Sequence, residues 1–310
     1  MTTKTRIPRR VVRLAEDYEY GDYAGFQLNF MDQLRGSILP STRVFRGDEL
    51  MWESNSLGCK GPELDDGRPV IGVFGDSVVQ GGYMDSFVNF IRVGPCQPLN
   101  GGVEGSNIAI TVDRFLEINA KVPMVAALVH SGWHNLVYGD NRESVWRENL
   151  DRVRGPPVIA HFRLSADFHP DMLATGYAHL MRDGYQQWTP EAVTPEGAAD
   201  FKRQLDRFNS FIESYCAETG RLLIDLDPVL APRSAAEVST HFFDLIHPRA
   251  SSYEAIGAAI SAQIAAAVSP LVTGSQLNAW SPSFKAPAAV AKPVAESHPA
   301  DDIGRNYPLW

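Results

Sequence analysis

The stretch that decides the fold is Pro69-Val-Ile-Gly-Val-Phe-Gly-Asp-Ser77-Val-Val-Gln-Gly81. Its first half is a short apolar run bounded by turn residues, which is typical of a strand buried on both faces. Gly75 permits a tight turn, and Ser77 then opens a segment that we predict to be helical to about residue 93. Ligands bind at the carboxyl ends of strands in doubly wound sheets, so Ser77 lies where a reactive group is expected. The simpler interpretation is that Asp76 or Ser77 only caps the helix.

The same alternation of strand and helix continues along the chain. A second strand is predicted near 97–100, and apolar runs predict further strands near 124–129, 157–160 and 222–226. Helical spacing of apolar residues predicts helices at 105–120 and 201–219, and an Ala-rich helix follows at 251–268. Strands that alternate with helices imply a parallel sheet covered on both faces. The predicted fold class is therefore α/β, with a doubly wound, five-stranded, mostly parallel sheet.

The chain divides into three predicted parts. Residues 1–65 lack clear periodicity and are predicted to form an irregular N-terminal extension packed on the core. Residues 66–272 form the α/β domain, with an aromatic-rich insertion at about 161–199. Insertions at strand ends often build substrate pockets, although this one could be a surface elaboration without a role. Residues 273–310 are predicted to be a Pro/Ala-rich C-terminal tail.

Composition narrows the class of protein. The 310-residue chain has a formal net charge of -9 at pH 7, which argues against a partner such as duplex nucleic acid. Its three cysteines suggest neither a disulfide framework nor a metal knuckle. The basic start of the chain lacks the apolar stretch of a secretory signal, and no run of about eighteen apolar residues is present. We expect a cytoplasmic location and no membrane partner, and the oligomeric state stays open.

A second chemical element is Asp244-Leu-Ile-His247-Pro248. A serine hydroxyl is a poor nucleophile until a base removes its proton, and histidine is the usual base near neutral pH. An aspartate three residues earlier can fold back to accept a hydrogen bond from Nδ1, which leaves Nε2 facing the serine. The alternative is an exposed loop histidine preceded by a turn aspartate, because this spacing is common.

Two further segments could supply an oxyanion hole. Asn100-Gly-Gly-Val-Glu-Gly105-Ser106 follows the second predicted strand, and a glycine there exposes its N–H group. Ser131-Gly-Trp-His-Asn135 follows the third, where an asparagine amide could donate a hydrogen bond. Taken singly, each has a structural alternative: glycines that make turns, and an asparagine that caps a loop.

As an ordered set, these segments resemble the SGNH (GDSL-type) hydrolase family. The match runs from Asn55-Ser-Leu-Gly58 through Phe74-Gly-Asp-Ser-Val-Val-Gln-Gly81 to Phe243-Asp-Leu-Ile-His-Pro248, and covers about two-thirds of the sequence. The resemblance implies a three-layer α/β/α fold without a metal or organic cofactor. It also implies a triad and an oxyanion hole. The triad residues would be Ser77, His247 and Asp244, and the oxyanion donors would be the Ser77 N–H, the Gly105 N–H and the Asn135 side chain.

One block departs from the family pattern, in which Gly-x-Asn-Asp or Gly-His-Asn-Glu is usual. Without a gap, His134 takes the place of the family's asparagine, and a neutral imidazole could still donate there. One inserted residue brings Asn135 into that place and also aligns Tyr138. We favour Asn135. The candidate substrate-binding residues are Asp76, Trp133, His134 and Tyr138.

The expected function is a serine esterase that cleaves a carboxylic ester of a small molecule, lipid or carbohydrate through an acyl-serine. An acyltransferase using the same triad is one alternative, and a non-catalytic binding protein on the same scaffold is another. The nucleophile elbow of α/β-hydrolases, the dinucleotide fingerprint and the P-loop are not found in the sequence. The spacing of the histidines does not favour a metal site. Those considered are His130, His134, His161 and His169.

Overall fold

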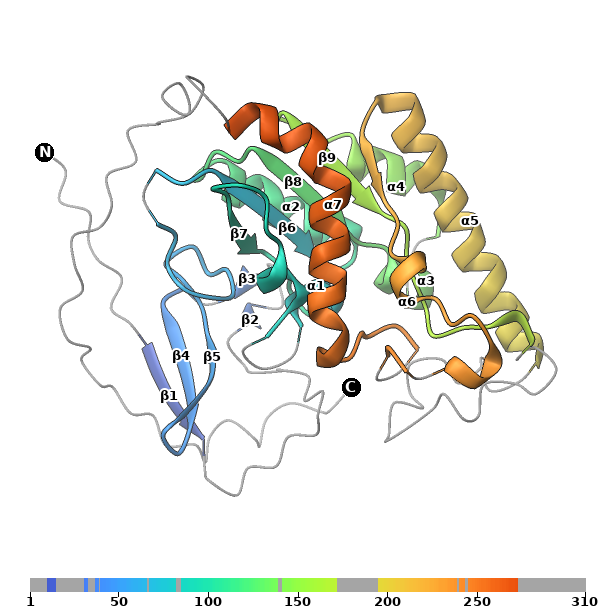
Figure 1. Ribbon diagram of the computed structural model, residues 1–310, viewed down its shortest axis with the longest axis horizontal. Coiled ribbons are helices and arrows are strands. Elements are labelled where there is room, and N and C mark those ends of the chain that lie inside the picture. Colours follow the sequence, from blue (N-terminus) through green and yellow to red (C-terminus); the bar gives the residue numbers. More distant parts are fainter. Residues whose placement is uncertain are drawn as a thin grey trace, which may run out of the picture.

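The centre of the computed structural model is a five-stranded sheet with strand order β10-β9-β8-β6-β7 (Figure 1). All four pairs of neighbouring strands are parallel. The strands are β6 (Val70–Gly75), β7 (Gln97–Asn100), β8 (Ala126–His130), β9 (Val158–Phe162) and β10 (Leu222–Ile224). Counted along the chain, this is the order 2-1-3-4-5 of doubly wound folds. The predicted α/β fold class is confirmed.

The structure describes only part of the chain. The described residues are 10–14, 31–32, 37–38, 40–65, 67–81, 85–138, 141–171, 195–238, 240–242 and 245–272. Within the predicted insertion, residues 172–194 lie outside these ranges, and so does the predicted tail at 273–310. The predictions for those two segments stay predictions.

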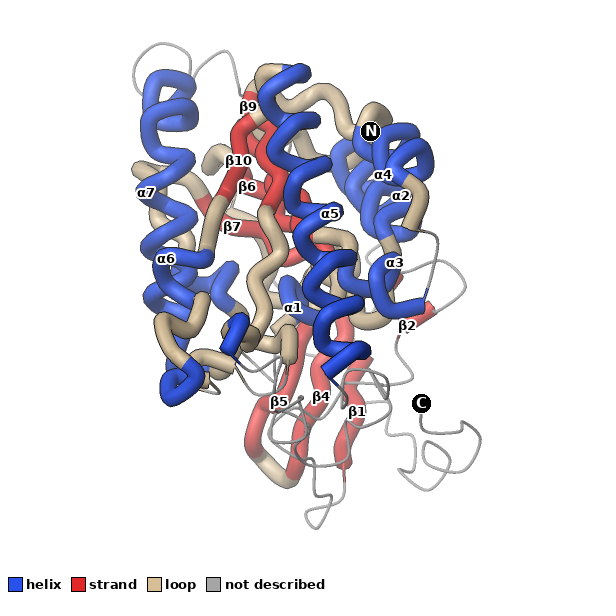
Figure 2. Tube along the Cα trace, turned by 90° about the vertical axis from the view of Figure 1, so that its right-hand side faces the viewer, coloured by secondary structure: helices blue, strands red, loops and turns tan. Residues whose placement is uncertain are grey.

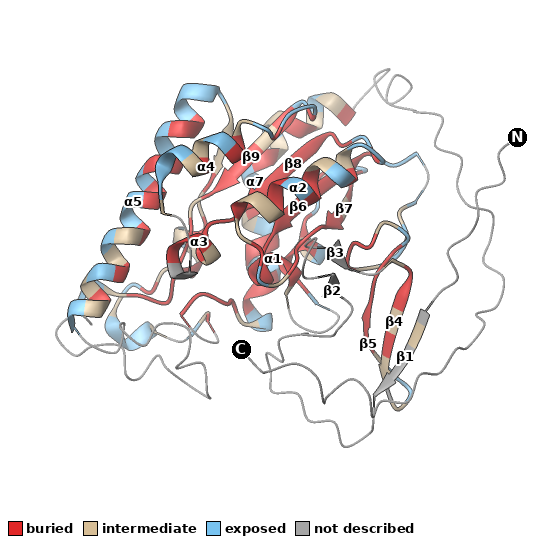
Figure 3. Cartoon of the chain, turned by 180° about the vertical axis from the view of Figure 1, so that it is seen from behind, coloured by how far each residue is buried: buried red, intermediate tan, exposed pale blue. Residues whose placement is uncertain are grey.

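Helices cover both faces of the sheet, which makes three layers (Figure 2). One face carries α2 (Ile108–Asn119), α4 (Glu143–Leu150) and α5 (Pro195–Thr219). The other carries α7 (Tyr253–Val272) and the 3₁₀ helix η1 (Phe87–Phe90), which pack on each other. Because helices cover both faces, every residue of β6 and β8 is buried (Figure 3).

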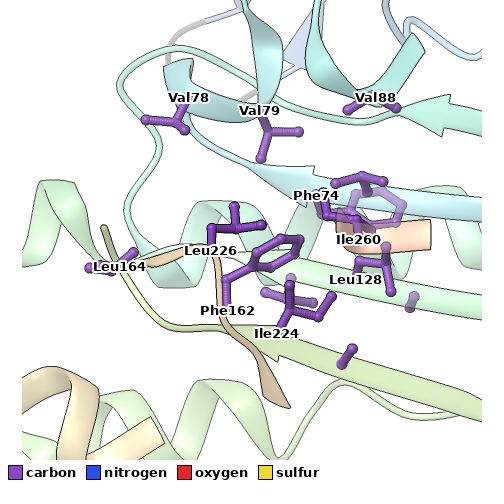
Figure 4. Packing of buried hydrophobic residues seen from close by; sticks show 14 of the residues in the cluster. Phe74, Val78, Val79, Val88, Leu128, Phe162, Leu164, Ile224, Leu226 and Ile260 are labelled. Atoms are coloured by element: carbon purple, nitrogen blue, oxygen red, sulfur yellow. The ribbon is translucent and has the colours of Figure 1, made fainter. Parts of the chain in front are cut away.

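The core continues from the sheet into both helix layers (Figure 4). On the α2 side, the Phe74 ring meets the Phe115 ring edge to face with centroids 5.4 Å apart. On the α7 side, the helix buries Ile256, Ile260 and Ile264 at intervals of four residues. This spacing places them on one stripe of the helix. The apolar patterns used to predict these helices therefore mark the faces that pack on the sheet.

Helix α7 also bears on the question of membrane segments. No run of about eighteen apolar residues predicted a transmembrane helix, but Ala250–Val272 has a mean hydropathy of 1.7 and is long and apolar enough to cross a membrane. In the structure its isoleucine stripe is buried against the protein core. Length and apolar composition are also properties of such a core helix.

The predicted helix from Ser77 to about residue 93 is wrong. Helix α1 covers only Ser77–Gln80, and η1 follows after a break. Gly81 ends α1 with φ 70°, and a Cβ there would lie 2.6 Å from the carbonyl oxygen of Asp85. Ser86 then caps η1 by accepting a hydrogen bond from the Val88 N–H at 3.2 Å. The chain turns at a glycine because a side chain would not fit there.

The predicted irregular extension contains strands, so that description is wrong for its described parts. β1 (Arg10–Leu14), β4 (Thr42–Arg46) and β5 (Glu49–Glu53) form a three-stranded sheet in the order β1-β4-β5, and β2 (Met31–Asp32) pairs with β3 (Ser37–Ile38). The small sheet lies next to the α1 end of the main sheet in both Figure 1 and Figure 2. Gly47, with φ 57°, makes the tight turn between β4 and β5. These strands are too short to give a clear period-2 pattern.

The remaining described elements are short; two follow the ends of β8 and β10, and two lie between the last strand's helix and α7. They are α3 (Trp133–Tyr138), α6 (Asp227–Leu230) and the 3₁₀ helices Ala235–Glu237 and Ala250–Ser252. Helix α4 also has no counterpart among the predicted helices. It is mainly polar and buries only Trp146, Asn149 and Leu150, so the sequence gives it little apolar periodicity.

Two histidines are buried in the sheet as neutral rings. His161 in β9 bonds through Nε2 to Nη1 of Arg221 at 3.0 Å. Because the guanidinium can only donate, His161 must accept at Nε2 and carry its proton on Nδ1. Burial, with the Arg221 charge second, lowers the pKa of His161 to about 3, and burial lowers the pKa of His130 in β8 to about 4.

These pKa values make the stability of the fold pH-dependent. Below pH 6.5, the ordinary histidine pKa, His161 is protonated in the unfolded chain, whereas in the folded protein it stays neutral down to about pH 3. Stability is therefore fully present above pH 6.5 and is lost as the pH falls through this window, by up to about 1.4 kcal/mol per pH unit for one group. In His161→Gln, which keeps an acceptor for Arg221, urea unfolding between pH 6.5 and 4.5 should show a shallower loss. An unchanged slope would contradict a neutral buried His161.

Candidate active site

Ser77 stands where β6 ends and α1 begins. Asp76 caps the helix: its Oδ1 accepts the Val78 N–H at 3.0 Å. Gly75 is required by close packing, because a Cβ there would lie 2.2 Å from the carbonyl oxygen of His130 in β8. Asp76 therefore caps the helix, as the simpler interpretation of the sequence held. The Ser77 hydroxyl is then available for another partner.

That partner is His247. The Ser77 Oγ lies 2.8 Å from His247 Nε2, across 170 residues of sequence. Both side chains are buried. His247 is held in a loop whose two sides pair through an isolated bridge between Phe242 and Pro248. The two groups that the sequence analysis paired therefore meet at hydrogen-bond distance. Asp244 lies outside the described residues, so its contact with Nδ1 stays a prediction.

The loop after β7 is fixed through its amide groups. The four N–H groups at 101–104 all donate, and their acceptors lie on β6, on β7 and on α1. The bonds are Gly101 N to Val73 O at 2.8 Å, Gly102 N to Asn100 Oδ1 at 3.0 Å, Val103 N to Gly75 O at 2.9 Å and Glu104 N to Gln80 Oε1 at 2.6 Å. Among the described residues the next N–H group, that of Gly105, has no acceptor, and neither has that of Ser77.

Two amide groups thus remain for a ligand, and both belong to predicted oxyanion donors. Gly105 adopts φ 76°, a conformation that glycine enters at little cost. Its neighbour in space is His134: a Cβ placed on Gly105 would lie 3.9 Å from Cε1 and Nε2 of that ring. An N–H group that the fold leaves unpaired is suited to binding an anionic oxygen.

The side chains of the segment after β8, Ser131-Gly-Trp-His-Asn135, point in different directions. Asn135 is buried, and its Oδ1 accepts the Ile108 N–H at 2.9 Å, at the start of α2. This bond fixes which end of the amide is oxygen, so Nδ2 points the other way. Trp133 stacks on Phe201 with centroids 6.1 Å apart and is 1% exposed, which places it in the core. The Tyr138 side chain lies outside the described residues.

Burial is the largest cause of the pKa shifts of the ionisable residues around His247. Burial raises the pKa of Asp76 to about 7, opposed by the Val78 N–H and by the charge of His247. Burial likewise raises the pKa of Glu104 to about 7, again opposed by His247. Burial, with repulsion from His247 second, lowers the pKa of His134 to about 4. His134 is therefore a neutral ring at pH 7, and two acids with raised pKa values accompany the Ser77–His247 pair.

Three residues of this region were not singled out from the sequence. Gln80 links α1 to Glu104, and neither carries a recognisable spacing. Lys60 is buried, and its Nζ donates to the carbonyl oxygens of Gln80 at 2.8 Å and Asp85 at 3.1 Å. Burial lowers the pKa of Lys60 to about 7. The only feature of the sequence that points to Lys60 is that it lies two residues after the Asn55-Ser-Leu-Gly58 block.

The described residues contain no group of three His, Cys, Asp or Glu side chains arranged to hold a metal ion. Within these ranges the chemistry of the region is that of a hydroxyl, imidazole rings, carboxyls and unpaired amides. Such a set can activate a nucleophile and receive negative charge on oxygen.

No protein-family model matches the sequence, and no curated protein does. Similar solved structures include a GDSL-like lipase from Bacteroides thetaiotaomicron, with 15% identity over 66% of this chain and 89% of the other, TM-score 0.44. A lipase/acylhydrolase from Enterococcus faecalis has 16% identity over 64% and 97%, TM-score 0.44. A carbohydrate acetylesterase family member from Sinorhizobium meliloti has 10% identity over 65% and 99%, TM-score 0.47.

The description of one of these structures, the GDSL-like lipase, names the family that the sequence motifs resemble. Because the identities and TM-scores are low, the resemblance rests on this chain's own features. These are the strand order, the Gly-Asp-Ser and Asp-x-x-His sequence blocks, and the contact between Ser77 and His247. The fold of this chain is a three-layer α/β/α sandwich with strand order 2-1-3-4-5, and its ordered sequence blocks resemble those of the SGNH (GDSL-type) hydrolases.

Proposed function

We propose that this protein is a serine esterase that cleaves a carboxylic ester through an acyl-serine intermediate. The observation that carries the proposal is the 2.8 Å contact between Ser77 Oγ and His247 Nε2. A hydroxyl becomes a nucleophile at neutral pH when an imidazole accepts its proton, and this geometry is within the range that such transfer needs. The unpaired amides of Ser77 and Gly105 support the same proposal.

In the first half of the reaction, the Ser77 oxygen attacks the ester carbonyl as its proton passes to Nε2 of His247. The carbonyl oxygen gains the negative charge, and the Ser77 and Gly105 N–H groups, with Nδ2 of Asn135, donate to it. When the tetrahedral intermediate collapses, the bond to the alcohol oxygen breaks. His247 gives its proton to the departing alcohol, and the acyl group stays on Ser77.

In the second half, water takes the place of the alcohol. His247 removes one proton from the water as its oxygen attacks the acyl-serine. The second tetrahedral intermediate releases the carboxylic acid, and the proton returns to the Ser77 oxygen. Asp244 is proposed to accept a hydrogen bond from Nδ1 of His247 throughout, which fixes the tautomer and stabilises the imidazolium. A small-molecule ester in the cytoplasm remains the proposed setting.

Replacement of Ser77 tests the nucleophile. Ser77→Ala should lose at least about 1,000-fold in kcat on a p-nitrophenyl ester, because no acyl-enzyme can form. It should also lose all labelling by a fluorophosphonate probe, while its melting temperature stays near that of the wild type. Ser210→Ala, an exposed position on α5, is the matched control and should keep both activities.

A wild-type protein that folds but is neither labelled nor active would overturn the esterase and favour a non-catalytic binding protein. Product analysis with and without an added alcohol separates the two enzymatic outcomes. Free acid alone indicates hydrolysis, and a new ester indicates acyl transfer to the alcohol.

The third oxyanion donor can be identified without disturbing α2. Asn135→Asp keeps an oxygen acceptor for the Ile108 N–H but replaces the Nδ2 donor, so kcat should fall by about 100-fold or more. His134→Ala should cost less than about tenfold if the ring only borders Gly105. The reverse order of these two effects, measured as kcat on the same ester, would make His134 the donor.

A further inference from the structure

Each of the two unpaired amides is directly preceded in the chain by a carboxyl residue. Asp76 precedes Ser77, and Glu104 precedes Gly105. Asp76 is 1% exposed, and its buried Oδ2 has no hydrogen-bond partner in the part of the chain that the structure describes. Both carboxyls lie close enough to His247 for its charge to lower their pKa values. Two acids therefore accompany the Ser77–His247 pair.

Glu104 is held in place by its backbone and not by its side chain. Its N–H donates to Gln80 Oε1 at 2.6 Å, and the preceding Val103 N–H donates to Gly75 O at 2.9 Å. The Glu104 side chain is only partly exposed, and its carboxyl has no hydrogen-bond or ion-pair partner among the described residues. Among the described residues, no lysine or arginine charge contributes to the shift of the Glu104 pKa. The backbone of Glu104 is therefore fixed next to Gly105, and within the described ranges nothing pairs with its carboxyl.

This arrangement has a cost for ester hydrolysis. An ionised carboxylate near the oxyanion hole opposes the negative charge that develops on the carbonyl oxygen. A half-buried carboxylate without a partner is also poorly solvated. A positive charge on the substrate would remove both costs, because it would pair with the carboxylate and screen it from the oxyanion.

We propose that Glu104, supported by Asp76, selects esters that carry a cationic ammonium group close to the scissile bond. The inference rests on the proposed function, since it assumes that Ser77 is the nucleophile. It assigns to Glu104 the role of a specificity residue that contacts the substrate. Gln80 is then a positioning residue, because its side chain holds the Glu104 backbone.

Two phosphonofluoridate probes of matched shape test the proposal at pH 8, where Glu104 is ionised. One carries a choline arm ending in trimethylammonium, and the other carries its neutral carbon isostere ending in tert-butyl. In both, the Ser77 oxygen attacks phosphorus, His247 takes the hydroxyl proton and fluoride leaves with the P–F electrons. The second-order rate constants of labelling, followed by mass spectrometry, should favour the cationic probe by about tenfold or more.

Glu104→Gln should bring the ratio of the two rates close to one. Glu104→Ala serves as a second neutral variant, and a melting curve for each shows whether it folds. Glu148→Gln, an exposed position on α4, is the matched control and should keep the wild-type ratio. These side-chain changes leave the bond from the Glu104 N–H to Gln80 available.

The outcomes separate the two proposals. A wild-type ratio near one, with Ser77 labelled by both probes, would overturn the inference and leave the esterase standing, and it requires no variant. Equal slowing of both probes in Glu104→Gln would also overturn it, because Glu104 would then support His247 and not the substrate. Failure of both probes to label the folded wild type would overturn the esterase and the inference with it.

Discussion

The carboxyl end of β6 is the point on which the rest of the structure depends. At Gly75 the chain passes so close to the end of β8 that a side chain would collide with the carbonyl oxygen of His130. The carbonyl oxygen of Gly75 in turn accepts the Val103 N–H. One residue thus joins three adjacent strand ends, and Ser77 follows it by two positions. The position of Ser77 is therefore set by backbone packing in the sheet.

The sequence was informative where one local pattern had one physical cause. A strand buried on both faces has an apolar sequence, so the apolar run at 69–74 located β6 to within a residue. The order of the sequence blocks was enough to bring Ser77 and His247 together in one predicted site, and the two side chains lie 2.8 Å apart. Local patterns failed where the cause lies elsewhere in the chain. The break at Gly81 depends on the approach of Asp85, and the bond between Gln80 and Glu104 joins segments with no shared pattern.

The same region concentrates buried ionisable groups. Lys60 at one end of α1 and Asp76 at the other both have pKa values moved toward 7 by burial, in opposite directions. Oδ1 of Asp76 accepts a hydrogen bond from the Val78 N–H, and Nζ of Lys60 donates hydrogen bonds to two carbonyl oxygens. Polar groups at both ends of a four-residue helix satisfy backbone groups that so short a helix cannot satisfy itself. This accounts for the stability of α1 in the absence of a long helix.

The place of Lys60 has a consequence for the boundary of the folding unit. Lys60 comes from the segment that follows the small N-terminal sheet, and it pairs through its backbone with Asn100 at the end of β7. A protein shortened to begin at residue 66 would keep every strand of the main sheet and yet leave the carbonyl oxygens of Gln80 and Asp85 without their ammonium donor. The folding unit therefore includes the segment that carries Lys60, although this segment contributes no strand to the main sheet.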